Sequence, residues 1–235
     1  MISRYRRSSL GPLWLTISMV VTVTAMGPLY GVLFGFDFET FIPHLALGLI
    51  FWGFISTSII EFGDAFFLSS NYLKQASFPL TIFILRVCYR NLIILGHNIV
   101  IYPIIMLILG ITPDWLMLLA APALVLVFAN LFWIGMVLAF FCTRYRDMVP
   151  IISSLMTLMF FMTPIVWKVE QLPESRQFLA KLNPFSAYLE LLRQPLSGKA
   201  PELFYWYYSG ATLIVGIVLG VIFMTRYRHR VAYWL

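Results

Sequence analysis

Glu61 and Asp64 have the spacing closest to that of a catalytic pair, because they stand three positions apart where an apolar stretch ends. Two carboxylates on one helical face could act as general acid and base if a cleft admitted a substrate. Arg86 and Arg90, four positions apart in the next apolar segment, could instead neutralise them, since charges beside apolar surroundings are usually paired. We therefore favour ion pairing and predict no catalytic residue. The predicted structural ion-pair residues are Glu61, Asp64, Arg86, Arg90, Arg146 and Asp147.

Motifs that bind nucleotides or metals are absent from the sequence. No G-x-x-x-x-G-K-[ST] phosphate loop occurs, and the only Gly-Lys pair, at Gly198, has arginine at position 193 where the first glycine would stand. The chain is therefore not expected to hydrolyse ATP by that route. The three histidines lie in different segments, so we predict no metal site and no cofactor in this chain. His97 lies within an apolar segment and is either a functional candidate or a hydrogen-bonded packing residue.

The composition is that of a membrane protein. Hydrophobic residues make up 61% of the 235 residues and charged residues 11%, against about 25% charged residues in soluble domains. A soluble fold of this size needs more polar side chains to cover its surface. The chain is basic, with 16 Lys and Arg against 10 Asp and Glu. These cations cluster at the ends of apolar runs, so no nucleic-acid partner is predicted.

The lengths of the apolar runs predict six membrane spans. A helix needs about 20 apolar residues to cross the bilayer core. We predict an all-α integral membrane protein whose residues 1–235 form a single transmembrane domain. The spans are predicted at 13–36, 41–62, 80–111, 115–142, 148–167 and 203–225.

The distribution of lysine and arginine predicts the orientation. Five of these cations lie at 168–202, where four glutamates nearly balance them, and the other 11 flank the opposite ends of the spans. By the positive-inside rule, both termini and the connection 61–78 are cytoplasmic, and 168–202 is external. Apolar pieces at 178–182 and 185–192 predict two short helices in the external connection. They either re-enter the membrane or lie on its outer surface.

Small and aromatic residues within the spans suggest packing faces. Gly27, Gly31 and Gly35 share one helical face, as do Gly216 and Gly220. Such faces serve contacts within a chain or between two copies, and we favour contacts within the chain. Aromatic residues inside spans suit a path along which sugar rings slide, although core packing explains each one separately. The candidate channel-lining residues are Tyr30, Trp52, Phe160, Phe161 and Trp167.

Several short motifs follow one another along nearly the whole chain. They are R-Y-R-R-S-S-L-G-P-L-W at 4–14, R-Y-R-D at 144–147, T-P-I at 163–165, N-P-F at 183–185, E-L-L-R at 190–193 and R-x-R-x-x-Y-W at 228–234. Each motif is weak alone. Together they resemble the pattern of ABC-2 permeases that export polysaccharides.

This resemblance implies the membrane subunit of an O-antigen (Wzm-type) or capsule exporter in the bacterial inner membrane. Such permeases act as homodimers and pass a lipid-linked polysaccharide outward, while a separate ATP-binding cassette subunit binds ATP and magnesium. The region 61–78 resembles the coupling region and 168–202 the external gate, and membrane lipid is a further partner of the basic N-terminal segment. The implied ATPase-contact residues are Arg4, Arg6, Arg7, Asn71, Tyr72, Lys74 and Gln75. Two alternatives stay open: an exporter of a small lipid or drug, and a membrane-embedded glycan transferase.

Overall fold

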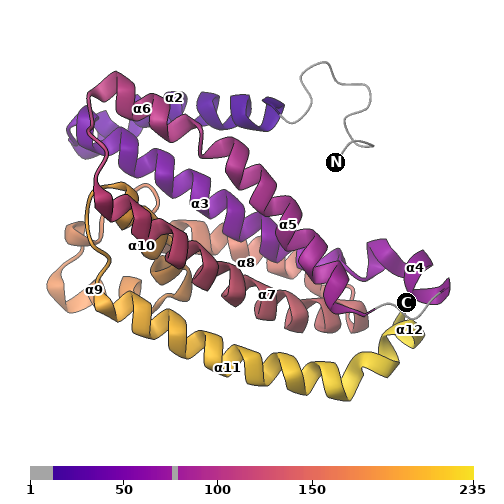
Figure 1. Ribbon diagram of the computed structural model, residues 1–235. Helices are drawn as coiled ribbons and strands as arrows, with labels where there is room; N and C mark the ends of the chain where they lie inside the picture. The colour runs from indigo at the N-terminus through magenta and orange to yellow at the C-terminus, as the bar shows by residue number, and fades with distance from the viewer. Residues whose placement is uncertain (1–12, 76–78) are drawn as a thin grey trace.

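The structure is a computed structural model that describes residues 13–75 and 79–235, and within these residues every regular element is helical (Figure 1). The longer helices run roughly along one direction and form a bundle. The α-helices are α2 (Leu13–Phe34), α3 (Phe38–Asp64), α4 (Ser70–Gln75), α5 (Thr81–Asn98), α6 (Ile101–Leu109), α7 (Ala120–Arg144), α8 (Met148–Met162), α9 (Glu174–Leu182), α10 (Pro184–Leu196), α11 (Leu203–Tyr227) and α12 (Val231–Trp234). The 3-10 helices are η1 (Phe67–Ser69), η2 (Trp115–Leu119), η3 (Val169–Gln171) and η4 (Arg228–Arg230).

Five helical segments of the described chain are long and apolar enough to cross a membrane. They are Trp14–Phe34, Phe38–Asp64, Thr81–Leu109, Trp115–Arg144 and Leu203–Arg230. The all-α prediction is therefore confirmed, and the chain is a multi-pass membrane protein with five such helices.

The predicted span 148–167 differs, because its helix α8 has only 15 residues and ends at Met162. Pro164 disfavours a helical conformation at the residue before it, and Thr163 is extended, with φ −93° and ψ 138°. The apolar stretch of the sequence continues to Trp167, but the helix ends five residues earlier, at Met162. At 1.5 Å per residue, α8 is about 22 Å long, which is shorter than the bilayer core of about 30 Å.

Helix α3 forms the centre of the bundle. In its most apolar 18-residue window 72% of the residues are buried, against 17% in the corresponding windows of α2 and α11. It packs against α2, α5, α6, α7, α8 and α10. A helix that is apolar on all sides needs such a position, whereas α2 and α11 each leave a broad apolar face uncovered.

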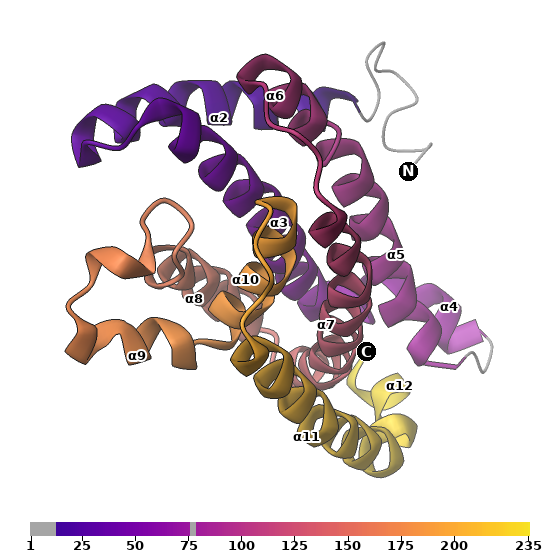
Figure 2. The ribbon, with the colours of Figure 1, turned by 60° about the vertical axis from the view of Figure 1, so that its left-hand side comes forward.

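Two short helices lie between α8 and α11, as predicted, but their environments differ. Helix α9 is largely exposed, and among its residues only Ala180 is buried. Helix α10 is buried along Ser186–Arg193 and packs beside α3, α7 and α11 (Figure 2). Its start is fixed locally, because Asn183 Oδ1 accepts a hydrogen bond from Phe185 N at 3.0 Å and Pro184 occupies the first turn. Asn183 Nδ2 also donates to Thr163 Oγ1 at 3.0 Å, which ties this start to the end of α8.

The glycine faces are used within the chain, as favoured from the sequence. Gly27 faces Ile42 of α3, and Gly216 lies directly against the indole of Trp133 on α7. These glycines allow neighbouring helices to approach closely. Gly35 has a different role, because its φ of +65° forms the turn between α2 and α3, and that conformation favours glycine.

Candidate functional site

A buried ion pair on α10 is the centre of the most polar region of the bundle. Glu190 and Arg193 are one helical turn apart and form an ion pair, with side chains only 7% and 5% exposed. Arg193 Nη1 also donates to Pro164 O at 2.8 Å and contacts His44 Nε2 at 3.0 Å. One guanidinium thus joins α10, α3 and the segment after α8. The contacts with Pro164 O and His44 give the buried guanidinium partners in addition to Glu190.

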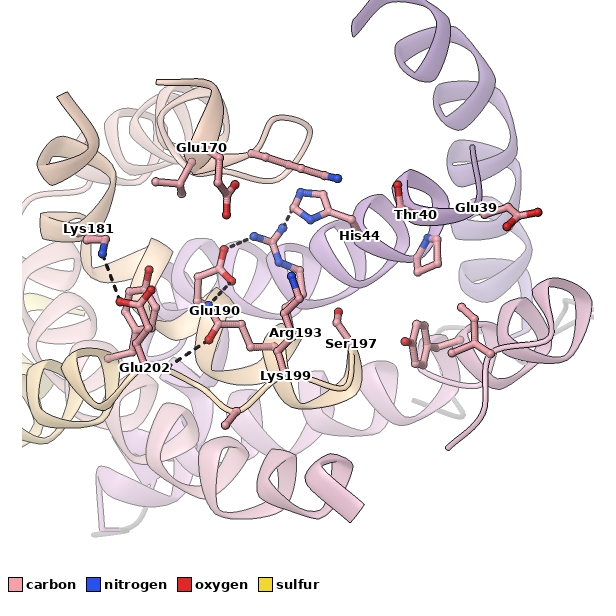
Figure 3. Close-up of a pocket in the computed structure, with 18 of the residues that line it drawn as sticks. Glu39, Thr40, His44, Glu170, Lys181, Glu190, Arg193, Ser197, Lys199 and Glu202 are labelled. Atoms are coloured by element: carbon pink, nitrogen blue, oxygen red, sulfur yellow. Dashed lines mark hydrogen bonds and ion pairs between the residues drawn. The ribbon is translucent and has the colours of Figure 1, made fainter. Parts of the chain in front are cut away.

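The hydrogen bonds continue from this pair toward α11. Gln194 Nε2 donates to Glu190 Oε2 at 3.1 Å, and Gln194 Oε1 accepts from Glu202 N at 3.3 Å. Glu202 also forms an ion pair with Lys181 of α9, at 3.2 Å and exposed to solvent. Figure 3 shows this chain of contacts from His44 to Lys181.

A cavity of about 980 Å³ adjoins these contacts. It lies at the end of the bundle where α3 begins, and it is lined from α3, α6, η3, α9, α10, α11 and the segment between α10 and α11 (Figure 3). Exposed Glu39 and Glu170 line it together with buried Glu190 and Arg193. The cavity therefore opens to the surface, and the buried ion pair forms part of its inner wall. Within the residues described, no group of three or more His, Cys, Asp or Glu side chains is arranged to hold a metal ion.

A second polar cluster, centred on Asn130, holds α7, α10 and α11 together. Asn130 Oδ1 accepts hydrogen bonds from Tyr188 OH and Thr212 Oγ1, both at 3.0 Å, and from Trp133 Nε1 at 3.1 Å. Its Nδ2 donates to Ser209 O at 3.1 Å. The Tyr188 hydroxyl acts as the donor in its contact with Asn130 Oδ1.

Replacing Asn130 with leucine is expected to lower the free energy of unfolding by about 1–3 kcal/mol, because the donors of buried Tyr188 and half-buried Trp133 lose their acceptor. Asn98→Leu is the matched control. Asn98 is also a buried amide in an apolar segment, yet its Oδ1 has no hydrogen-bond partner among the residues described. That control is expected to leave stability unchanged or to raise it. Denaturation in detergent, followed by circular dichroism, distinguishes the two variants, and equal losses would contradict the role assigned to Asn130.

At the opposite end of the bundle, the structure pairs only some of the predicted ion-pair residues. Glu61 of α3 forms an ion pair with Arg90 of α5, and Asn91 Nδ2 donates to Glu61 Oε2 at 2.7 Å. Within 13–75 and 79–235, Asp64 and Arg86 are in no ion pair. Of the two arginines on the next helix, Arg90 is the one that meets Glu61.

Arg146 and Asp147, which are also among the predicted ion-pair residues, are in no ion pair within the part of the chain that the structure describes. Neighbouring residues in the sequence project in different directions, so their side chains do not face each other. The Arg146 guanidinium instead lies over the ring of Phe67, 4.7 Å from its centroid. This contact brings the turn between α7 and α8 beside the segment between α3 and α4.

The predicted ATPase-contact residues fall in two places. Asn71 and Tyr72 are exposed on α4, with Tyr72 58% exposed, and α4 also carries Lys74 and Gln75. Arg4, Arg6 and Arg7 lie outside the residues that the structure describes. Helix α12 packs near α4 and α7, so the C-terminal segment reaches the same end of the bundle (Figure 1).

The candidate channel-lining aromatics do not share one surface. Trp52 is 7% exposed and packs edge-on against Phe160 and Phe185, so in a single chain it is a core residue. Phe161 is 70% exposed, and its carbonyl accepts a hydrogen bond from Trp167 Nε1 at 3.1 Å. Tyr30 stacks on Phe34 of α2, with ring centroids 5.8 Å apart.

Sequence reasoning missed the two buried polar clusters. It treated Glu190 and Arg193 as charges in an external connection and as part of the E-L-L-R motif, although their spacing of one helical turn, at the end of the apolar piece 185–192, allows an ion pair. Asn130 was also visible as an amide in an otherwise apolar span. No local signal assigns His44 to Arg193, because the two are 149 positions apart.

The fold and these sites define a multi-pass helical membrane protein without a nucleotide-binding motif in its sequence. Residues 1–196 match the family described as ABC-2 type transporter, and the chain belongs to this family. It is thus a transport subunit that lacks an ATPase domain, and permeases of this kind work with an ATP-binding subunit. The chain is similar to the O-antigen export system permease protein RfbA of Myxococcus xanthus, with 27% identity over 188 residues that cover 77% of this chain and 71% of the relative. It is also similar to the protein of the same name from Klebsiella pneumoniae, with 22% identity over 235 residues that cover 97% of this chain and 89% of the relative.

Proposed function

We propose that this permease exports a lipid-linked polysaccharide of the O-antigen or capsular type across the bacterial inner membrane. The observation that carries this proposal is the similarity to two O-antigen export permeases, one of which aligns over 97% of this chain. Collinear similarity of that extent is consistent with a shared transport path as well as a shared fold. The energy comes from hydrolysis of ATP, which the separate ATP-binding cassette subunit binds together with magnesium.

The proposed arrangement is a homodimer in which each chain crosses the membrane six times with both ends in the cytoplasm. In this arrangement α8, with the extended segment after it, is the fifth crossing, and α10 dips into the membrane from the external side. A short helix followed by irregular backbone is tolerated at membrane depth where protein or water covers it. The burial of α10 among α3, α7 and α11 supports this reading.

The exposed surface of α8 is partly polar, since Ser154 and Thr157 stand on it among the apolar residues Ile151, Leu155, Leu158, Phe161 and Met162. Ser154, Thr157 and Phe161 are exposed at i, i+3 and i+7 of one helical face. The exposed positions of α11 between residues 214 and 222 are all aliphatic, as lipid contact requires. We therefore propose that two copies meet with the α8 faces toward a shared channel. We propose that Phe160, Phe161 and Trp167 line this path together with Tyr30 of α2, and that Trp52 supports Phe160 from the core.

The α4 end is the proposed docking site for the ATP-binding subunit. Exposed Asn71 and Tyr72 lie on α4, at the end of the bundle where α3 ends and α5 begins (Figure 1). Tyr72→Ala is expected to reduce the amount of ATP-binding subunit that co-purifies in mild detergent by about tenfold, the effect of losing one interface anchor. Tyr207→Ala, which alters a 74% exposed tyrosine on α11, is the matched control and should leave capture unchanged. Equal capture by both variants would count against docking at α4.

Export itself is tested in the source strain. Deleting the gene should stop surface polysaccharide from appearing and leave lipid-linked polymer inside, and restoring the gene should reverse both effects. Normal surface polysaccharide with impaired efflux of a drug or a small lipid would instead favour the alternative exporter. A glycan transferase would be favoured by two results together. A membrane extract of the deletion strain would lose polymer synthesis, and alanine at Glu61, Asp64 and His97 would also abolish that synthesis.

A further inference from the structure

The cavity of about 980 Å³ beside the Glu190–Arg193 pair has the size of a ligand site. Its volume is at the upper end of the range of small-molecule pockets, about 300–1,000 Å³. Exposed Glu39, Glu170 and Lys199 line it together with buried Glu190 and Arg193. A ligand can therefore enter from the surface and contact α3, η3 and α10 at the same time.

The charges that line the cavity are balanced. Its basic residues are Lys168, Lys181, Arg193 and Lys199, and its acidic residues are Glu39, Glu170, Glu190 and Glu202. Two ion pairs, Glu190–Arg193 and Lys181–Glu202, use half of each set. Among the residues described, Glu39, Glu170, Lys168 and Lys199 are in no ion pair. A balanced lining does not favour a simple anion or cation, because either one would meet as many like charges as opposite charges.

The remaining polar groups of the lining are both donors and acceptors. The amides of Gln177 and Gln194 and the hydroxyls of Thr40 and Ser197 line the same cavity. Carboxylates only accept hydrogen bonds, ammonium groups only donate them, and amides do both. A ligand with many hydroxyl groups can use all of these together, since each hydroxyl both donates and accepts.

We propose that this cavity is a binding subsite for a short stretch of carbohydrate. In this site Glu170 accepts hydrogen bonds from sugar hydroxyls, Lys199 donates to them, and Gln194 contacts them from the inner wall. The Glu190–Arg193 pair holds that wall in place through Pro164 O and His44. The identity of the natural sugar rests on the proposed function, whereas the subsite rests on the cavity.

The test uses the full-length permease with its ATP-binding subunit in lipid nanodiscs. The probe is a set of oligosaccharides released by mild acid from the surface polysaccharide of the source strain, and binding is followed by tryptophan fluorescence, since Trp167 adjoins Lys168 of the lining. Wild-type protein should bind saturably. The double variant Glu170→Gln, Lys199→Gln should bind at least about tenfold more weakly, the effect expected from losing hydrogen bonds to charged groups.

The matched control is the double variant Glu174→Gln, Arg176→Gln. It also removes one acidic and one basic charge, but both residues are exposed on α9 and do not line the cavity. Its affinity should equal that of wild type. Equal affinity of the control and the cavity variant, or no saturable binding by wild type, would overturn the subsite.

Three further outcomes separate this inference from neighbouring ones. Saturable binding of glycerol phosphate without binding of the oligosaccharides would identify a lipid-headgroup site and overturn the carbohydrate assignment. Export of polysaccharide by the restored strain without saturable oligosaccharide binding would overturn the subsite and leave the proposed function intact. Saturable binding without export in that strain would support the subsite and count against the proposed function.

Discussion

Glu190→Gln is expected to lower the free energy of unfolding by about 3–5 kcal/mol, because it leaves the buried Arg193 charge uncompensated. The replacement keeps the size of the side chain, so the effect reports charge rather than packing. Arg193 is 5% exposed and its remaining partners, Pro164 O and His44, carry no negative charge. Titration of the detergent-solubilised protein with dodecyl sulfate, followed by circular dichroism, measures the loss.

The exposed pair on the same side of the molecule supplies the control. Glu202→Gln breaks the ion pair with Lys181, whose side chains are 52% and 38% exposed, and it should cost only about 0–1 kcal/mol. Adding Arg193→Met to Glu190→Gln removes the uncompensated charge and should restore much of the stability. If Glu190→Gln cost no more than Glu202→Gln, the buried pair would not stabilise α10 as described.

Gly216→Ala is expected to destabilise the packing of α11 on α7 by about 1–3 kcal/mol, the usual cost of overfilling a packed core. A Cβ atom at this position would lie 2.0–2.2 Å from three atoms of the Trp133 indole. The ring cannot move away cheaply, because its Nε1 donates to Asn130 Oδ1. The same denaturation measurement applies here.

Gly210 on the same helix is the control, since a Cβ atom there would meet nothing within 4 Å. Gly210→Ala should be neutral or stabilising, because alanine is preferred to glycine in helices. Trp133→Ala removes the ring that Gly216→Ala meets, so the two changes together should cost less than the sum of each alone. Strict additivity would show that the ring is not what excludes a side chain at 216.

The sequence predicted those parts of the architecture that depend on consecutive residues, such as apolar spans and helix breaks. Five of the six predicted spans correspond to helices long enough to cross a membrane, and the break between α9 and α10 lies at Asn183-Pro184. Helix α8 ends at Met162 and not at Trp167, where the predicted span ends, because a hydropathy window sums composition and does not register that Pro164 disfavours a helical conformation at Thr163. The proline makes this helix end predictable from the residues alone.

The site depended on contacts that no local pattern contains. Among the predicted ion-pair residues, the structure pairs Glu61 with Arg90, because one turn of α3 lies beside one turn of α5. His44 meets Arg193, and Asn130 meets Tyr188, only because α3, α7 and α10 pack together across 149 and 58 positions of the chain. Trp52 illustrates the same point, since its burial follows from Phe160 and Phe185 closing over it.

By itself, the sequence determined that this protein enters a membrane as apolar helices and carries no phosphate loop, because apolar length and motif spacing are properties of consecutive residues. Only the tertiary structure decided that α10 is buried while α9 is exposed, and that a cavity opens beside the Glu190–Arg193 pair. Both short helices are bordered by similar turn residues and contain charges. What separates them is the presence of α3, α7 and α11 around one and not the other, and that arrangement comes from packing of the whole bundle.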